Sequence, residues 1–136
     1  MANIDKPWLI LPCSGIGKSL GTITRWAAYE LLESNTIPEL RLLCLARLVD
    51  LDSEARAILE SHRIITIDGC PKKCATLNVE KNNINVTKEY LMAKFLVKNK
   101  DLKLENNVID PGEGGKELAK RIAQEIIHDI ENGGKP

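Results

Sequence analysis

The stretch Ile64-Ile65-Thr66-Ile67-Asp68-Gly69-Cys70 begins as an apolar, β-branched run and ends in a turn that carries a cysteine. Two other apolar runs, Trp8–Leu11 and Leu42–Leu45, are equally short and unbroken. Unbroken runs, in contrast to alternating ones, are typical of parallel strands that are covered on both faces. We therefore expect three buried strands, the third of them over Ile64–Ile67.

Helical patterns lie between these runs. Apolar residues recur at helical spacing in Thr22–Ser34 and in Ser53–His62, the second with Asp52 or Ser53 as its N-cap. The alternation of strands and helices predicts an α/β fold with right-handed crossovers. We expect a single three-layer domain with a short, mostly parallel sheet and helices on both faces.

The second half of the chain is less regular. A helix is predicted over Pro71–Lys81, with its proline in the first turn, and a short edge strand over Ile84–Val86. Thr87 is a candidate cap for a helix that follows it, and the polar stretch Asn99–Asn107 predicts a loop. A wide apolar stripe then predicts a long last helix that ends at Gly133.

Length and charge narrow the class of protein. A chain of 136 residues favours one domain, with 1–5 and 132–136 as loose ends. Its 19 Lys and Arg balance 19 Asp and Glu, which gives no basic surface for general nucleic-acid binding. No apolar run approaches the roughly 18 residues of a membrane span, and the N-terminus lacks a signal-peptide pattern. We expect a cytoplasmic protein with neither nucleic-acid nor membrane partners.

The cysteines are the most informative part of the composition: Cys13, Cys44, Cys70 and Cys74. A reducing cytoplasm disfavours a disulfide framework, which leaves core packing, a metal site or reactive thiols. Because the carboxyl ends of parallel strands share one edge, three separate segments are expected to deliver thiols there. If Cys70 and Cys74 both lie in a first helical turn, they face the same way, since residues four apart share a face.

Four thiolates suit a tetrahedral zinc ion. An iron–sulfur cluster is less favoured, because ferredoxin-type spacings are absent. Core packing explains Cys44 equally well, since it lies within Leu-Leu-Cys-Leu. Asp68 and Lys72 are candidates for supporting the cysteines, the first through a loop amide and the second by offsetting thiolate charge. An ordinary turn is an alternative explanation for the aspartate, and a solvated surface position is an alternative explanation for the lysine.

The segment Pro12–Ser19 resembles a nucleotide phosphate loop in its last three residues, Gly17-Lys18-Ser19. Its first glycine is replaced by Pro12, which lacks a backbone N–H donor, and we do not expect nucleotide hydrolysis. A weaker prediction is an anion site formed by Gly15, Gly17, Lys18 and Ser19 at a helix N-terminus. The alternative is a simple strand-to-helix turn.

Enzymatic thiol chemistry is the competing hypothesis. Cys13 after the first strand would face a helix N-terminus, which lowers a thiol pKa. Phosphatase-like loops place an arginine six residues after such a cysteine, where this chain has Ser19, and Arg25 lies further along the helix. Thiol redox or sulfur transfer through Cys13 or the Cys70/Cys74 pair stays open, and no catalytic set, substrate or protein partner is identifiable.

Several of these residues together resemble a known family. Asp68-Gly69-Cys70 followed by Cys74, Cys13-Ser14-Gly15 after the first strand, and Leu-Cys-Leu-Ala at Leu43–Ala46 are similar to the DGC-domain family, which is named for its Asp-Gly-Cys motif. The resemblance covers most of the chain from Trp8 to the last helix. It implies a zinc-binding protein whose chelators are the four cysteines, and it implies little about biological role.

Overall fold

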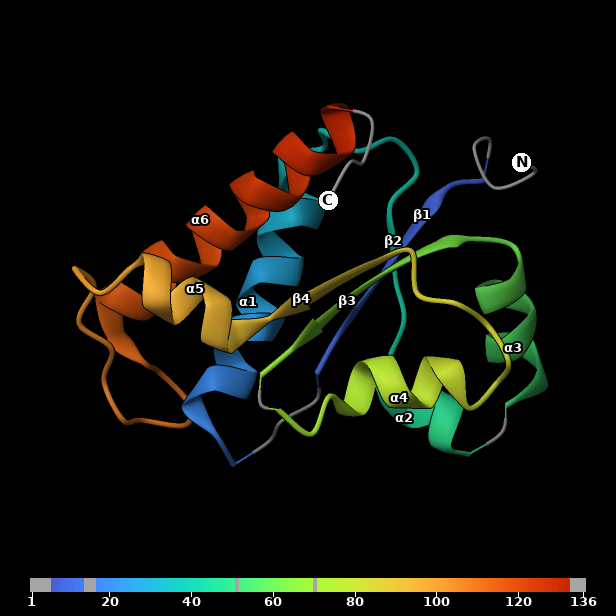
Figure 1. Cartoon of the computed structure of the whole chain (residues 1–136), viewed down its shortest axis with the longest axis horizontal. Coiled ribbons are helices and arrows are strands. Elements are labelled where there is room, and N and C mark those ends of the chain that lie inside the picture. The colour runs from blue at the N-terminus through green and yellow to red at the C-terminus, as the bar shows by residue number, and fades with distance from the viewer. Residues whose placement is uncertain (1–5, 14–16, 51, 70, 133–136) are drawn as a thin grey trace.

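The computed structural model describes residues 6–13, 17–50, 52–69 and 71–132 (Figure 1). A parallel sheet in the order β2-β1-β3-β4 forms its centre. The expected α/β domain with a parallel sheet is confirmed. The strands are β1 (Trp8–Pro12), β2 (Arg41–Leu42), β3 (Arg63–Asp68) and β4 (Lys88–Leu91). The helices are α1 (Ser19–Ser34), α2 (Leu45–Val49), α3 (Ser53–Glu60), α4 (Cys74–Glu80), α5 (Met92–Lys98) and α6 (Gly112–Glu131).

The two faces of the sheet carry separate apolar cores. Ile10 of β1 and Ile65 of β3 face α1, α5 and α6, whereas Leu9 and Ile64 face α2, α3 and α4. Figure 1 shows α1 and α6 side by side on one face and α2, α3 and α4 on the other. Side chains of a strand alternate between faces, so burial on both faces produces the unbroken apolar runs of the sequence.

The first half of the chain follows the sequence pattern with one correction. The strand expected over Leu42–Leu45 is β2, which ends at Leu42, while Leu45 begins α2. The apolar run continues past the strand because Leu43, Leu45 and Leu48 all pack into the core of the second face. A short apolar run does not by itself distinguish a strand from a buried helical turn. Asp52 caps α3, as expected, by accepting from the backbone N–H groups of Glu54 and Ala55.

The second half of the chain departs further from the elements that the sequence pattern predicts. The strand expected over Ile84–Val86 lies at β4, and Thr87 caps no helix: it pairs with Ile64, through its backbone N–H and its hydroxyl. β4 is an edge strand that carries Lys88 and Glu89, and charged edge strands give a weak apolar signal. The loop over Asn99–Asn107 is confirmed.

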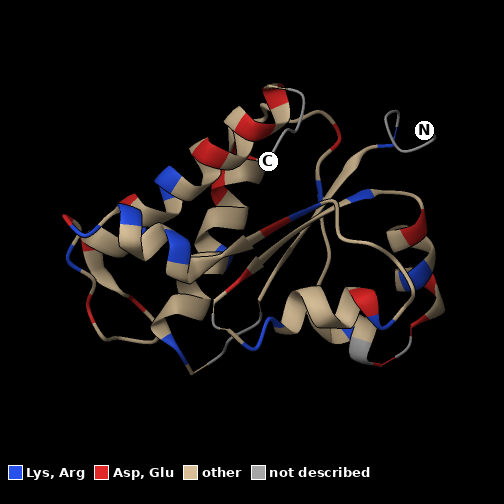
Figure 2. Ribbon diagram, viewed as in Figure 1, with Lys and Arg blue, Asp and Glu red and all other residues tan. Residues whose placement is uncertain are grey.

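The last helix of the chain is present and apolar along one side, as its stripe predicts. It ends at Glu131 with Asn132 as its C-cap, and Gly133 lies outside the described residues. No helix in the described part of the chain is long and apolar enough to cross a membrane. Figure 2 shows acidic and basic residues interspersed on α3 and α6, in line with the balanced net charge.

The strand order creates a point where consecutive connections leave the sheet toward opposite faces. After β1 the chain passes through α1 on one face, and after β3 it passes through α4 on the other. Ligands of open parallel sheets bind in the crevice at such a point, outside the carboxyl ends of the two strands. Cys13, directly after β1, and Gly69, directly after β3, flank this crevice.

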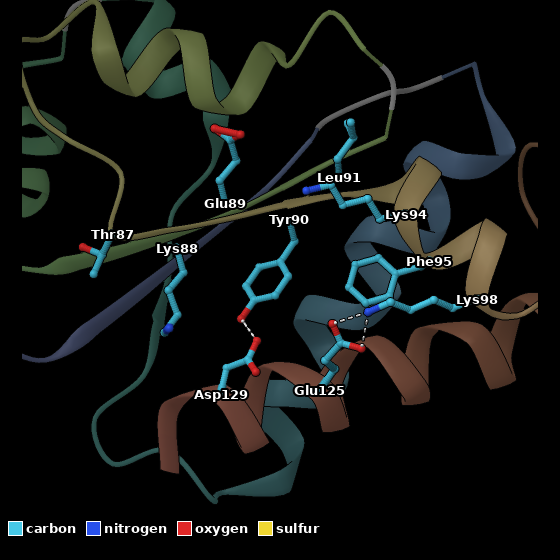
Figure 3. A pocket seen from close by; sticks show the side chains of 10 residues that line it. All are labelled: Thr87, Lys88, Glu89, Tyr90, Leu91, Lys94, Phe95, Lys98, Glu125 and Asp129. Carbon is cyan, nitrogen blue, oxygen red and sulfur yellow. Dashed lines mark hydrogen bonds and ion pairs between the residues drawn. The ribbon is translucent and has the colours of Figure 1, made fainter. Parts of the chain in front are cut away.

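A hydrogen bond ties the edge strand to the last helix. Tyr90 points from β4 toward α6, and its hydroxyl donates to Asp129 Oδ2 at 2.6 Å (Figure 3). The pair lines a pocket of about 380 Å³ between β4, α5 and α6, in which Lys98 Nζ also lies 3.5 Å from a carboxylate oxygen of Glu125. The pKa of Tyr90 is raised, mainly by burial and to a smaller extent by its hydrogen bond to the Asp129 carboxylate. Tyr90 and Asp129 therefore join β4 to α6, and Lys98 and Glu125 join α5 to α6.

This pair makes stability depend on pH in the alkaline range. The unfolded tyrosine loses its proton near pH 10, while the folded one keeps it, so the free energy of unfolding should fall as the pH rises above about 10. We expect Tyr90→Phe to cost about 1 kcal/mol at neutral pH and to make the alkaline fall shallower. Urea unfolding of both proteins at several pH values measures this, and parallel curves would contradict it.

Candidate functional site

Cys13 is held by backbone hydrogen bonds at the crevice between β1 and β3. Its N–H donates to the carbonyl of Ile67 at 2.8 Å, which extends the β1–β3 ladder by one residue. Its carbonyl lies 3.1 Å from the hydroxyl of Thr24 on α1 and shares that donor with the carbonyl of Gly21, which is closer at 2.6 Å. The residue is buried, with 6% of its surface exposed. Its backbone is thus fixed to both the sheet and the helix that follows it.

Asp68, the aspartate of the Asp-Gly-Cys sequence, anchors the start of α4. The residue is 1% exposed, and its carboxylate accepts from the N–H groups of Ala75, at 2.8 Å, and Thr76, at 3.3 Å. It also accepts from the Thr76 hydroxyl at 2.6 Å. Since that hydroxyl gives its single proton to Asp68, it must accept from Thr66 Oγ1, 2.8 Å away.

This network gives Asp68 a definite role. Both carboxylate oxygens are engaged with the first turn of α4, whose own N-cap residue, Lys73, makes no side-chain cap. A side chain from β3 therefore does the work of a helix cap. Asp68 thus holds amides of a helix in place of the expected loop amide, and it positions the helix that begins with Cys74. Its support of a cysteine site stays a prediction.

Gly69 lets the β3–α4 connection lie against α1. A Cβ atom on this buried glycine would stand 3.4 Å from the backbone nitrogen of Gly21 and 3.5 Å from the carbonyl carbon of Leu20. An alanine at this position would therefore just touch the backbone of α1. The β3–α4 connection thus lies against this helix.

Cys44 and Cys74 lie at the starts of two of the helices on the other face, α2 and α4. Cys44 is the N-cap residue of α2 and Cys74 is the first residue of α4, and both are exposed. The helices α2 and α4 pack against each other (Figure 1). Core packing therefore does not account for Cys44, since its neighbours Leu43 and Leu45 fill the core in its place.

The helix predicted over Pro71–Lys81 is α4, and its predicted start at Pro71 is wrong. The helix begins at Cys74 and not at Pro71, because Lys73 before it has a left-handed backbone with φ of 53°. Cys70 itself lies outside the described residues. Lys72 is exposed, and Lys73 pairs with Glu89 of β4 at 2.7 Å; that hydrogen bond raises the pKa of the lysine.

The predicted anion loop has the expected position between β1 and α1. Gly17 has a φ of 103°, Lys18 is the exposed N-cap residue, and Ser19 opens the helix. The first turn holds no acidic side chain. Gly15 lies outside the described residues.

The donor chemistry of the cysteines suits zinc, but the described residues hold no assembled metal site. Among residues 6–13, 17–50, 52–69 and 71–132, no three His, Cys, Asp or Glu side chains are grouped so that they could hold a metal ion. Cys13, Cys44 and Cys74 thus lie at one edge of the sheet without forming such a group, and the fourth cysteine is not among the residues searched.

Sequence reasoning did not place Arg25 beside Cys44. It lies too far from Cys13 along the chain for a phosphatase-like loop, yet it lines a pocket together with Cys44 and Tyr29. The signal was present in α1: Thr22, Arg25 and Tyr29 are spaced by three and four residues and so share one face of the helix. The strand order then brings that face to the end of β2.

A graded series of variants tests the anchoring role of Asp68. Asp68→Asn replaces one acceptor oxygen by an N–H donor that faces other donors, so we expect a loss of about 1–3 kcal/mol in the free energy of unfolding. Thr66→Val removes only the outermost hydrogen bond and should cost less. Urea unfolding measures both, and an aspartate variant as stable as the wild type would contradict the role.

A second pair of variants tests the packing of Gly69. We expect Gly69→Ala to change stability by less than about 1 kcal/mol, because its Cβ makes an ordinary contact. Gly69→Val should cost about 1–3 kcal/mol by overpacking against α1. Equal stability of the two variants in thermal unfolding would show that α1 does not constrain this position.

Comparison with known proteins agrees with these features. The model of the DGC domain family matches residues 9–128, which include all four cysteines and the Asp68-Gly69-Cys70 sequence. No curated protein and no solved structure matches the chain. Because the match spans nearly the whole chain, this protein belongs to the DGC-domain family.

Proposed function

We propose that this DGC-domain protein binds one zinc ion through Cys13, Cys44, Cys70 and Cys74. The observation that supports this most is the placement of the three described cysteines. They follow three different parallel strands, β1, β2 and β3, and so come to the same edge of the sheet. Zinc is a d¹⁰ ion that thiolates hold in tetrahedral sites, and when bound it would supply a structural cross-link or a Lewis acid.

The proposal requires that the metal draws the thiols together. The described cysteines do not form a metal-holding group, and Cys13 is buried while Cys44 and Cys74 are exposed. Zinc sites commonly form only as the metal binds, and the binding free energy then adds to folding. The hydrogen bonds of Asp68 support the zinc proposal, because they fix the start of the helix that carries Cys74.

A second candidate is thiol chemistry, favoured by the exposure of Cys44 and Cys74. Reactive cysteines are thiolates that solvent and substrate can reach. A closed zinc site would protect these thiols, whereas a catalytic one would leave at least one of them reactive in the purified protein. The two candidates therefore differ in thiol reactivity before and after chelation.

Zinc content and thiol titration on the same sample test the proposal. For protein purified without added metal, we expect about one zinc per chain and thiols that react only after chelation. Cys74→Ser and Cys70→Ser should lose most of the zinc and part of the stability. His128→Gln, which changes an exposed side chain of α6, is the matched control and should retain the metal.

The contrary results are equally clear. Metal-free protein with four freely titrating thiols, one of them unusually fast, would replace zinc binding by thiol chemistry. Full zinc content in Cys70→Ser would remove that residue from the ligand set.

A further inference from the structure

The outer side of β4 carries backbone N–H groups that no strand pairs with. β4 is the last strand of the sheet, and β3 is its neighbour on the inner side. The N–H of Thr87 donates to the carbonyl of Ile64 on β3, and successive peptide groups of a strand point to alternate sides. The N–H groups of Lys88 and Tyr90 therefore point away from β3. In the part of the chain that the structure describes, no other strand or loop accepts from them.

The pocket between β4, α5 and α6 follows this open edge as a groove of about 380 Å³ (Figure 3). Every residue from Thr87 to Leu91 lines it, and no described residue of β3 does. Successive side chains of a strand point to opposite faces of the sheet, so a pocket over one face would touch only every second residue. The groove therefore runs along the outer edge of β4, with α5 and α6 beside it.

The acidic side chains of the groove already have partners. Glu89 points to the opposite face of the strand from Tyr90 and Lys88 (Figure 3), and its carboxylate pairs with a lysine that follows β3. The other two carboxylates lie on α6 and bind groups from α5 and β4. The three pairs are Lys73–Glu89 at 2.7 Å, Lys98–Glu125 at 3.5 Å and Tyr90–Asp129 at 2.6 Å.

Two lysines of the groove are left without an acidic partner. Lys88 on β4 and Lys94 on α5 both line it, and neither forms an ion pair with any described residue. The hydroxyl that binds Asp129 is uncharged, so this carboxylate still offsets one of the two ammonium groups. The groove therefore retains an excess of positive charge beside the open backbone.

We propose that the open edge of β4 binds an extended, acidic peptide segment of a partner protein as an added strand of the sheet. An exposed strand edge recognises an extended backbone through main-chain hydrogen bonds, and pockets beside it select the side chains. The N–H groups of Lys88 and Tyr90 supply the first element, and the unpaired ammonium groups of Lys88 and Lys94 supply the second. Lysine on an edge strand also discourages pairing with apolar strands, which favours an acidic partner further.

A second copy of this chain matches the edge less well. Two antiparallel β4 strands related by a two-fold axis pair residues symmetrically about the axis. An axis at Lys88 would place two lysines directly opposite each other, and an axis at Glu89 would place two glutamates opposite each other. Like charges in such positions destabilise a strand pair. An acidic segment meets no such repulsion from Lys88.

This inference goes beyond zinc binding and does not require a metal. The groove contains none of the cysteines that are proposed as zinc ligands. Zinc content and peptide binding can therefore be measured on the same sample, and the failure of one leaves the other standing.

Amide hydrogen exchange, measured by NMR on the purified protein, tests the proposal. The probe is a short capped peptide in which glutamate and threonine alternate, so that its carboxylates share one face when it is extended. At saturation, we expect exchange at Lys88 and Tyr90 to slow at least about fivefold, since their amides gain acceptors. The amide of Glu89, which faces β3, should change little. A peptide with lysine in place of glutamate should bind at least about fivefold more weakly.

Variants separate the backbone from the charge. Lys88→Pro removes an outward N–H and leaves the β3–β4 ladder intact, since proline is tolerated at such edge positions, and it should weaken the glutamate peptide at least about tenfold. Lys88→Ala keeps the N–H, so it should weaken binding only about two- to fivefold, as should Lys94→Gln. Lys120→Gln, on an exposed part of α6 outside the groove, is the matched control and should leave the affinity unchanged.

Four results would overturn the inference. One is unchanged exchange at Lys88 and Tyr90 with the glutamate peptide in excess. Another is equal affinity for the glutamate and lysine peptides. A third is equal affinity in Lys88→Pro and Lys88→Ala; if the proline variant does not fold, Lys94→Gln and the exchange data still decide. The last is a dimer in sedimentation whose two amides are protected before peptide is added, which would assign the edge to a second copy.

Discussion

The buried carboxylate of Asp68 connects the parts of this structure on which the site depends. It extends from the end of β3 and accepts hydrogen bonds from the first turn of α4, so that the helix cannot shift along the sheet without losing them. The backbone N–H of Cys13 donates a hydrogen bond to the carbonyl of Ile67, the residue directly before Asp68. The positions of Cys13 and Cys74 therefore both depend on the last residues of β3. Gly69, which follows this strand, lies against the backbone of α1.

The Asp-Gly-Cys sequence gains a physical explanation from this arrangement. The aspartate replaces a missing helix cap, and the glycine lies against the backbone of α1. Only the cysteine remains as a ligand for the proposed zinc site. Two of the three motif residues thus act on structure, and they do so to place thiols at the crevice where α/β sheets commonly bind their ligands.

Sequence patterns predicted the buried centre of the fold and failed at its edges. β1 and β3 are covered on both faces, so their apolar runs are complete, and the N-cap at Asp52 follows from local chemistry. β4 is an edge strand with charged residues, and the sequence pattern predicted it too early in the chain, over Ile84–Val86. The start of α4 was missed because it depends on the left-handed backbone of Lys73 and a cap supplied from another strand. Arg25 was missed since only the strand order brings it beside Cys44.

The edge of the sheet therefore carries soft thiols that suit the proposed zinc ion. Zinc K-edge X-ray absorption spectroscopy of the purified protein tests the central claim most directly, because it identifies the ligand atoms without relying on a variant. The account predicts a first shell of four sulfur atoms at about 2.3 Å from the zinc. A shell dominated by nitrogen or oxygen, or protein that retains no zinc at all, would contradict it.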